Sequence, residues 1–407
     1  MLGALGVGAA VVLLGGAMRS SVSNVSGWRQ RRRERKRQAL LRVRDEGRRW
    51  LWSGDLDAAT RSLARYVEQH PKDVDAVLAL ASTYEERGEL ETARRLLESA
   101  RGEVGSEARL LHKLGLLALK RGNVGAAIDW LREAVQQHPE SPRLLGELAA
   151  ALAAEGRFAE AVPIAQRQVA AERQPGKRDE AIRQLTALRF RAAEADPDTA
   201  AGDAALRRLL GESPEFVPTV LLLASRARAA GDVRAAERLY RDAIRRRPHG
   251  VLLERLTALH AAAGQVERAL PILRDACAGN HLAGPRLALA RALVQASKFP
   301  AADAELAELV RDTPAWRSDG IDVAPERDLI AGELALAREL DREAATLLGR
   351  AAAGSHRPFS YTCTRCARTW NEWRDQCRCG GAGTLEWIVD APARELGTAE
   401  TIATTGS

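Results

Sequence analysis

Hydrophobic and polar positions divide the chain into three stretches of different character. The first, Leu2 to Met18, has 17 uncharged and mostly apolar residues, which is at the short end of what crosses a bilayer as a helix. A long middle stretch repeats small and apolar residues with a period of 34, and a last stretch gathers cysteines and tryptophans. We therefore predict a transmembrane anchor over residues 1–18, a helical array over 50–353 and a small domain over 354–390.

Glycines set the period of the middle stretch. Gly54, Gly88, Gly122 and Gly156 are spaced by 34 residues, and an alanine follows each by five positions, at Ala59, Ala93, Ala127 and Ala161. The same offset joins Gly231 to Ala236 and Gly264 to Ala269, and it recurs without glycine at Ser297 and Ala302 and at Leu340 and Ala345. Prolines follow seventeen residues after the glycine or its substitute, at Pro71, Pro139, Pro248 and Pro314.

This pattern resembles the tetratricopeptide repeat family over roughly residues 40–350. A small residue at the turn lets two antiparallel helices close, the alanine lets the second helix approach its neighbours, and the proline ends it. We expect an all-α solenoid of eight or nine helix pairs, with a concave surface for binding. The glycines and alanines build this fold and select no ligand. The irregular stretch from Gln174 to Pro218 is either a longer helix pair or a bend.

Charge changes the picture at the N-terminal end. Between Arg19 and Arg49 there are 12 basic and 3 acidic residues, so this segment carries a net charge of +9, while the remaining chain, at −2, is nearly neutral. A neutral body argues against nucleic acid as a partner. The basic segment 19–49 follows the apolar run, which disfavours a cleaved signal and places the bulk of the chain on the cytoplasmic side of a bacterial inner membrane, after a single pass.

Four cysteines fall within seventeen residues: Cys363 and Cys366, then Cys377 and Cys379. In a reducing compartment such a cluster predicts a metal site, with disulfide or redox use as the alternative. Four thiolates suit one zinc ion, or one iron ion in a rubredoxin-type site. The second pair is one residue shorter than a usual knuckle, and we expect it on an extended strand, where residues i and i+2 face the same side.

Other residues of this region have simpler interpretations. Trp370, Trp373 and Trp387 are predicted to cover the small domain, whose folding energy comes largely from the metal. His356 is a possible substitute ligand, although a surface histidine is the favoured interpretation. Cys277 is expected to be a packed apolar thiol in a repeat helix.

The whole layout resembles the lipopolysaccharide assembly protein B (LapB) family. The resemblance is carried by the basic stretch leading into W-L-W-S-G-D-L-D-A-A (Trp50 to Ala59), by the segment from His70 to Arg94, and by Y-T-C-T-R-C (Tyr361 to Cys366), with Trp373 ahead of Cys377. The shortened C-x-C pair and the tail 391–407, which we predict to be disordered, depart from the family. The resemblance implies a membrane anchor, tetratricopeptide repeats and a rubredoxin-like domain.

The resemblance also implies a function. Such proteins act as inner-membrane adaptors that promote proteolysis of the deacetylase LpxC by the protease FtsH, which regulates lipopolysaccharide synthesis. The alternatives are a general repeat scaffold in envelope assembly and a rubredoxin-like electron-transfer module docked by repeats. A nucleic-acid-binding ribbon is disfavoured, because residues from Tyr361 to Trp387 carry a charge of only +1. A homo-oligomer remains possible.

We expect no enzyme activity. The sequence has no H-E-x-x-H, no G-x-S-x-G and no G-x-x-x-x-G-K-S/T motif. His70 and His138 occupy the same repeat position, sixteen residues after Gly54 and Gly122, which is a position of the fold and not a catalytic pair.

Overall fold

The computed structural model describes residues 38, 41–196, 198–278, 282–311 and 322–390, and the chain divides into two compact units at residue 175. The predicted anchor 1–18, most of the basic segment 19–49 and the tail 391–407 lie outside the described residues. Among the helices that are described, none combines the length and the apolar character needed to cross a membrane.

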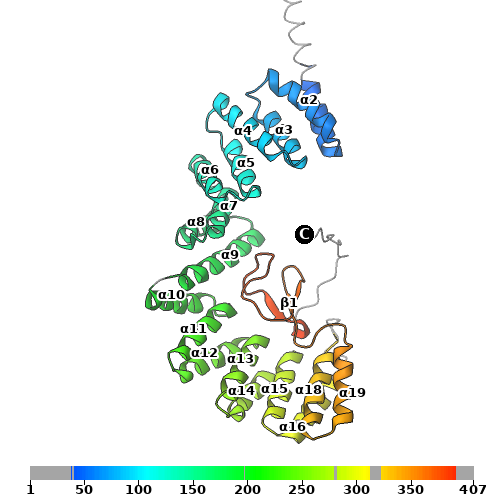
Figure 1. Ribbon diagram of the computed structural model, residues 1–407. Helices are drawn as coiled ribbons and strands as arrows, with labels where there is room; N and C mark the ends of the chain where they lie inside the picture. Colours follow the sequence, from blue (N-terminus) through cyan, green and yellow to red (C-terminus); the bar gives the residue numbers. More distant parts are fainter. Residues whose placement is uncertain (1–37, 39–40, 197, 279–281, 312–321, 391–407) are drawn as a thin grey trace, which may run out of the picture. The chain divides into compact units, whose positions relative to one another are not determined.

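The first unit consists of paired antiparallel helices (Figure 1). Helical residues 41–53 are followed by α2 (Leu56–Gln69), α3 (Val74–Glu86), α4 (Leu90–Val104), α5 (Ala108–Lys120), α6 (Val124–Gln137), α7 (Pro142–Ala154) and α8 (Phe158–Ala171). Several begin at a short polar side chain that accepts a hydrogen bond from the backbone N–H three residues on, as Asp55, Asp73 and Asn123 do. This capping satisfies a backbone donor that the helix itself leaves unpaired.

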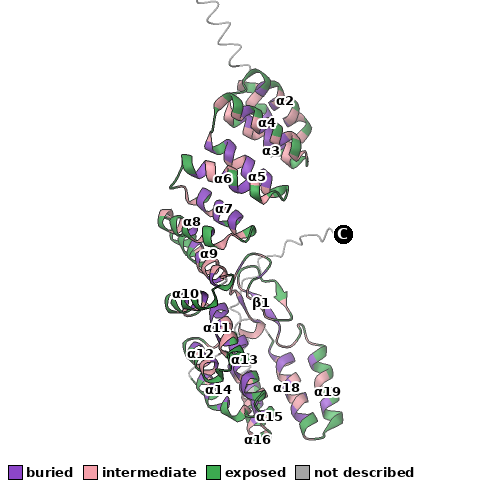
Figure 2. Ribbon diagram, turned by 60° about the vertical axis from the view of Figure 1, so that its left-hand side comes forward, coloured by how far each residue is buried: buried purple, intermediate pink, exposed green. Residues whose placement is uncertain are grey.

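The second unit also consists largely of paired helices. Its helices are α9 (Pro175–Glu194), α10 (Thr199–Glu212), α11 (Val217–Ala229), α12 (Val233–Arg246), α13 (Gly250–Ala261), α14 (Leu270–Cys277), α15 (Ala283–Gln295), α16 (Phe299–Arg311), α18 (Ala324–Ala337) and α19 (Asp341–Ala352), with a short 3-10 turn, η1 (Val266–Arg268), before α14. Buried residues lie on the faces where neighbouring helices meet (Figure 2). The described helices thus form nine consecutive pairs over the two units, in agreement with the expected eight or nine.

Eight of these pairs turn through a residue with positive φ. Six are the predicted glycines, Gly54, Gly88, Gly122, Gly156, Gly231 and Gly264, and two are Ser297 and Glu339. The alanine five residues after each of the eight is at most 1% exposed. The pairing of Ser297 with Ala302 is confirmed, but that of Leu340 with Ala345 is wrong by one residue. Glu339 takes the left-handed conformation there, Ala344 is the buried alanine and Ala345 is exposed.

Helix ends agree with the proline pattern where it is described. Helices α2, α6 and α12 each end two residues before a proline, at Gln69, Gln137 and Arg246. Pro314 lies outside the described residues. The irregular stretch proves to be a longer helix pair, because α9 runs for 20 residues and the end of α9 packs on α10 through a small apolar cluster.

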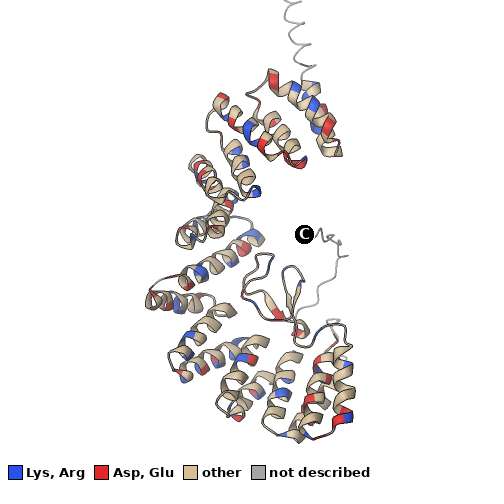
Figure 3. Ribbon diagram, in the orientation of Figure 1, with Lys and Arg blue, Asp and Glu red and all other residues tan. Residues whose placement is uncertain are grey.

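Both signs of charge are interspersed along the helices of each unit (Figure 3). Many of these side chains form ion pairs, such as Lys113 with Glu85 and Arg291 with Glu333. Carboxylates on the repeat helices therefore serve mainly as partners of nearby cations.

A three-stranded sheet follows the last helix. It consists of β1 (Tyr361–Cys363), β2 (Thr369–Trp370) and β3 (Leu385–Trp387) in the antiparallel order β2-β1-β3, and the 3-10 turn η2 (Ile388–Asp390) follows it. We call residues 360–390 the ribbon. Tyr361, Leu385 and Trp387 belong to the same buried cluster as residues of α11 to α18, so the ribbon shares the core of the second unit. The fold is mostly helical, with this small sheet beside the repeats.

Candidate metal centre

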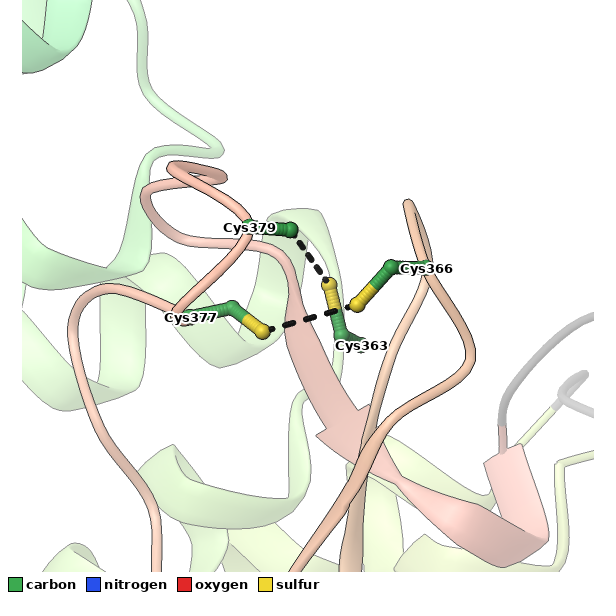
Figure 4. Close-up of side chains that lie close together, drawn as sticks. All are labelled: Cys363, Cys366, Cys377 and Cys379. Atoms are coloured by element: carbon green, nitrogen blue, oxygen red, sulfur yellow. Dashed lines mark hydrogen bonds between the residues drawn. The ribbon is translucent and has the colours of Figure 1, made fainter. Parts of the chain in front are cut away.

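The four ribbon cysteines converge. Their Sγ atoms all lie within 4.8 Å of one another, and the Cys363–Cys379 and Cys366–Cys377 sulfur pairs are 3.7 and 3.6 Å apart (Figure 4). Four sulfurs on a tetrahedron with metal–sulfur bonds of about 2.3 Å are about 3.8 Å apart. The cluster could therefore hold one metal ion.

The first pair lies at the end of β1. Beyond it the chain turns through Ala367, which has a φ of +56° and whose N–H donates to the Cys363 carbonyl at 2.8 Å. Burial by itself would raise the pKa of the Cys363 thiol. Hydrogen bonds from the Thr384 hydroxyl and from the backbone amides of Arg365 and Cys366 outweigh it and bring the pKa to about 6. These donors favour the thiolate, which is the form that binds a metal.

The second pair does not lie on an extended strand, as we had expected. Cys377 and Cys379 lie in a tight turn, which the Gly380 N–H closes by donating to the Cys377 carbonyl at 2.9 Å. Gly380 has a φ of +82°, a conformation that glycine adopts at little cost. The turn brings both thiols to the same side and compensates for the missing residue of the knuckle.

Two other candidates lie outside the cluster. His356 is not a surface histidine, since its side chain is only 11% exposed and its Nε2 lies 3.0 Å from the buried carboxylate of Glu326. Cys277 is half-buried at the end of α14 against the shared core, and burial raises its pKa to about 12. The interpretation of Cys277 as a packed thiol is thus in agreement with the structure.

The residues that fix the ribbon on the repeats are not apparent from the sequence pattern. The indole of Trp387 lies so close to Gly250, at the start of α13, that a Cβ there would be 2.1 Å from the ring. Gly284, at the N-terminus of α15, is approached just as closely by the carboxylate of Asp390. This carboxylate accepts a hydrogen bond from the Gly284 N–H at 2.7 Å. The only sequence signal is a glycine in the first turn of each of these helices.

Polar contacts reinforce this seat. His249 is buried, and its Nε2 lies 2.8 Å from the Leu385 carbonyl of β3. The hydroxyl of Tyr361 donates to Glu254 at 2.6 Å, and Arg247 forms an ion pair with Glu386. The ribbon is therefore held by α12, α13 and α15 through both apolar and polar contacts.

The ribbon also contains two half-buried tryptophans, Trp370 and Trp373. The guanidinium of Arg374 lies 4.6 Å from the ring centre of Trp370, and both Trp370 and Trp373 pack against the shared core. Trp387 belongs to this same core, so all three tryptophans lie at the core that the ribbon shares with the repeats.

Comparison with solved structures finds weak likenesses to MamA. A crystal structure of MamA protein has 18% identity, covers 44% of this chain and 93% of that chain, and has a TM-score of 0.34. The corresponding values are 23%, 41%, 91% and 0.32 for MamA AMB-1, and 14%, 42%, 93% and 0.35 for the MamA RS-1 ArsTM double mutant. TM-scores below 0.5 carry no information about this chain's function. No curated protein matches the chain.

Family profiles match the repeats directly. One tetratricopeptide repeat profile matches residues 52–114 and 118–189, and a second matches residues 221–281. These stretches coincide with the helix pairs that turn through Gly54, Gly88, Gly122, Gly156, Gly231 and Gly264. The chain is therefore a tetratricopeptide-repeat protein with a four-cysteine cluster near its C-terminus.

Proposed function

We propose that this protein is an adaptor of the bacterial inner membrane, which binds partner proteins through its repeats and folds its ribbon around one zinc or iron ion. Tetratricopeptide repeats form protein-interaction scaffolds, because stacked helix pairs present an extended surface. The observation that carries the proposal is the packing of the four-cysteine ribbon into the core of the repeats. The thiols face one another, which favours a structural metal over catalysis.

The finer proposal concerns the partners. The order of apolar run, basic segment, repeats and cysteine ribbon is that of the LapB family, as are the segments from Trp50 to Ala59 and from Tyr361 to Cys366. On this basis we propose that the chain presents LpxC to the protease FtsH and so limits lipopolysaccharide synthesis. The apolar run from Leu2 to Met18 would hold the repeats at the cytoplasmic face of the membrane.

The half-life of LpxC in the native host tests this role. Depletion of the protein should lengthen the half-life, and the parent chain should restore it. A Cys363→Ser, Cys366→Ser variant should fail to restore it, whereas Cys277→Ser makes the same chemical change away from the cluster and should succeed. An unchanged half-life on depletion would refute the LpxC role and leave the repeat scaffold in place.

A second candidate, electron transfer, is favoured by the exposure of Cys366 and the partial exposure of Cys379, which bring the cluster to the surface of the ribbon. Metal analysis of the full chain distinguishes a structural metal from an electron-transfer centre. One zinc per chain would exclude redox use, because zinc has no second oxidation state here. One iron per chain, with a visible absorbance that bleaches reversibly on reduction, would favour electron transfer.

A further inference from the structure

A cleft of ≈ 1030 Å³ in the second unit lies between the ribbon and the repeat helices. Its walls come from α13, α15, α18 and α19, from the 354–359 loop that follows α19, and from ribbon residues that include Tyr361 and Trp373. A smaller groove of ≈ 300 Å³ adjoins it and shares Glu254, Arg291 and Phe359. The function proposed above uses neither.

The smaller groove is largely apolar. Leu253 and Ala288 form part of its wall, together with the rings of Phe359 and Trp387. The Arg291 guanidinium lies 4.9 Å from the ring centre of Phe359 and is held by an ion pair with Glu333, at 2.8 Å. The groove thus offers an apolar recess next to a charged mouth.

The cleft itself has cations without partners. Arg255 and Arg357 are exposed in its lining, and within the described part of the chain neither has a hydrogen-bond or ion-pair partner. The acidic residues of the lining are Glu254, which accepts the Tyr361 hydroxyl, and Glu372. The lining thus has three guanidinium groups, those of Arg255, Arg291 and Arg357, against two carboxylates, and this excess of positive charge favours an anionic ligand.

We propose that this cleft binds an extended acidic segment of a partner protein, with its carboxylates on Arg255 and Arg357 and an apolar side chain in the groove beside Trp387. The inference rests on the proposed scaffold function and specifies one of its binding surfaces. Guanidinium groups bind carboxylates in a bidentate manner, and aromatic walls supply the apolar part of a peptide site. Because Tyr361, Trp373 and Trp387 belong to the ribbon, binding also requires the folded ribbon.

Fluorescence anisotropy with the full chain tests the proposal. The probe is a fluorescein-labelled peptide of alternating glutamate and leucine, and its counterpart has lysine in place of glutamate. The glutamate peptide should bind and the lysine peptide should not. The double variant Arg255→Glu, Arg357→Glu should weaken binding by about tenfold or more, because arginine is enriched among the residues that dominate interfaces and each exchange also places a like charge against the peptide.

A matched control makes the same charge change elsewhere. Arg238 and Arg245 are exposed on α12 and line neither the cleft nor the groove. Arg238→Glu, Arg245→Glu should leave the affinity within about twofold, because screened charges outside the contact contribute little. The metal content of each variant, measured in parallel, shows whether the ribbon has stayed folded.

Three results would overturn the proposal. The first is equal binding of the two peptides, and the second is equal affinity of the cleft variant and the control. The third is binding that occurs only after removal of residues 391–407, which would assign the cleft to the chain's own C-terminal segment. None of these would change the LpxC half-life on depletion, so the cleft and the adaptor role fail independently.

Discussion

Ser297 and Glu339 occupy repeat turns that elsewhere contain glycine, with φ of +57° and +62°. A residue with a Cβ costs about 1–2 kcal/mol in this left-handed region, whereas glycine costs about 0.5–1 kcal/mol through the greater freedom of the unfolded chain. These two costs oppose each other, and the cost of placing a Cβ in the left-handed region is larger than the entropic cost of glycine. The repeat therefore selects the residue at this position by backbone conformation and not by contact.

This balance predicts opposite effects for two exchanges. Ser297→Gly should stabilise the second unit by about 0.5 kcal/mol, and Gly122→Ala, at a φ of +74°, should destabilise the first unit by about 1 kcal/mol. A Cβ at Gly122 would meet nothing within 4 Å, so only the backbone term changes. Urea unfolding of the full chain measures both, and a neutral Gly122→Ala would contradict the argument.

Gly250 is required for a different reason, since its φ is ordinary and the constraint is the indole of Trp387. Gly250→Ala should push the ring away and destabilise the ribbon by about 1–3 kcal/mol, as overpacking of a core does. Gly349→Ala, inside α19, is the matched control. A Cβ there meets nothing within 4 Å, and alanine should stabilise the helix by up to about 1 kcal/mol. Similar stability of the two variants would show that the Trp387 contact is loose.

At the scale of elements, His249 joins a helix to the sheet. It accepts the Val251 N–H at the start of α13 through Nδ1 and bonds the Leu385 carbonyl of β3 through Nε2, so it fits only as the neutral imidazole. Burial lowers its pKa to about 4. As the pH falls through 6.5 the unfolded chain takes up a proton that the folded chain does not. The contribution of His249 to stability is therefore complete above pH 6.5 and is lost towards pH 4.

The destabilisation caused by His249→Gln should accordingly shrink on acidification. Between pH 6.5 and 5.5 it should fall by about 1 kcal/mol, measured by urea unfolding with the metal content checked at each pH. The pKa values of His356 and Asp390 are raised in the folded chain, so these two groups make the fold more stable as the pH falls. Comparison of variant with parent removes their effect. A pH-independent difference would mean that His249 is protonated in the folded chain.

The elements that could be predicted from the sequence are those whose cause is local. The offset from Gly231 to Ala236 marks a turn and a helix contact within six residues, so it could be recognised directly. At the last repeat Glu339 replaces the glycine, and the spacing was assigned one residue late. The contacts of His249 with Leu385 and of Gly284 with Asp390 join residues 136 and 106 positions apart, and no periodic pattern records them.

In the candidate metal centre, too, the features with a local cause could be predicted and the others could not. The spacing of Cys363 and Cys366 predicted a four-thiol cluster, because thiolate ligands recur at such short intervals. The local shape of the second pair was not predicted, since the sequence alone did not show that Gly380 would make a turn in place of a strand. The contact of the ribbon with α13 could not be predicted from the sequence either, because it depends on the three-dimensional course of the repeats.

At the scale of the molecule, the ribbon belongs to one of the two units. It adds Tyr361, Leu385 and Trp387 to the core of the second unit, whereas the first unit has a core of its own between α2 and α5. A ribbon with three short strands buries too little to fold alone, and both the metal and the helices compensate for this. The stability of the second unit is therefore coupled to the metal.

Removal of the metal should affect the two units unequally. In the Cys363→Ser, Cys366→Ser variant the ribbon should unfold and uncover the inner faces of α13 and α15, which the ribbon contacts at β3 and η2. Loss of a buried tryptophan such as Trp387 alone costs about 3–5 kcal/mol. Amide hydrogen exchange should show reduced protection in α13 and α15 and unchanged protection in α3 to α6, with Cys277→Ser as the control. Retained protection of α13 in metal-free protein would show that the apolar seat holds the ribbon without the ion, and metal binding would then need a role other than folding.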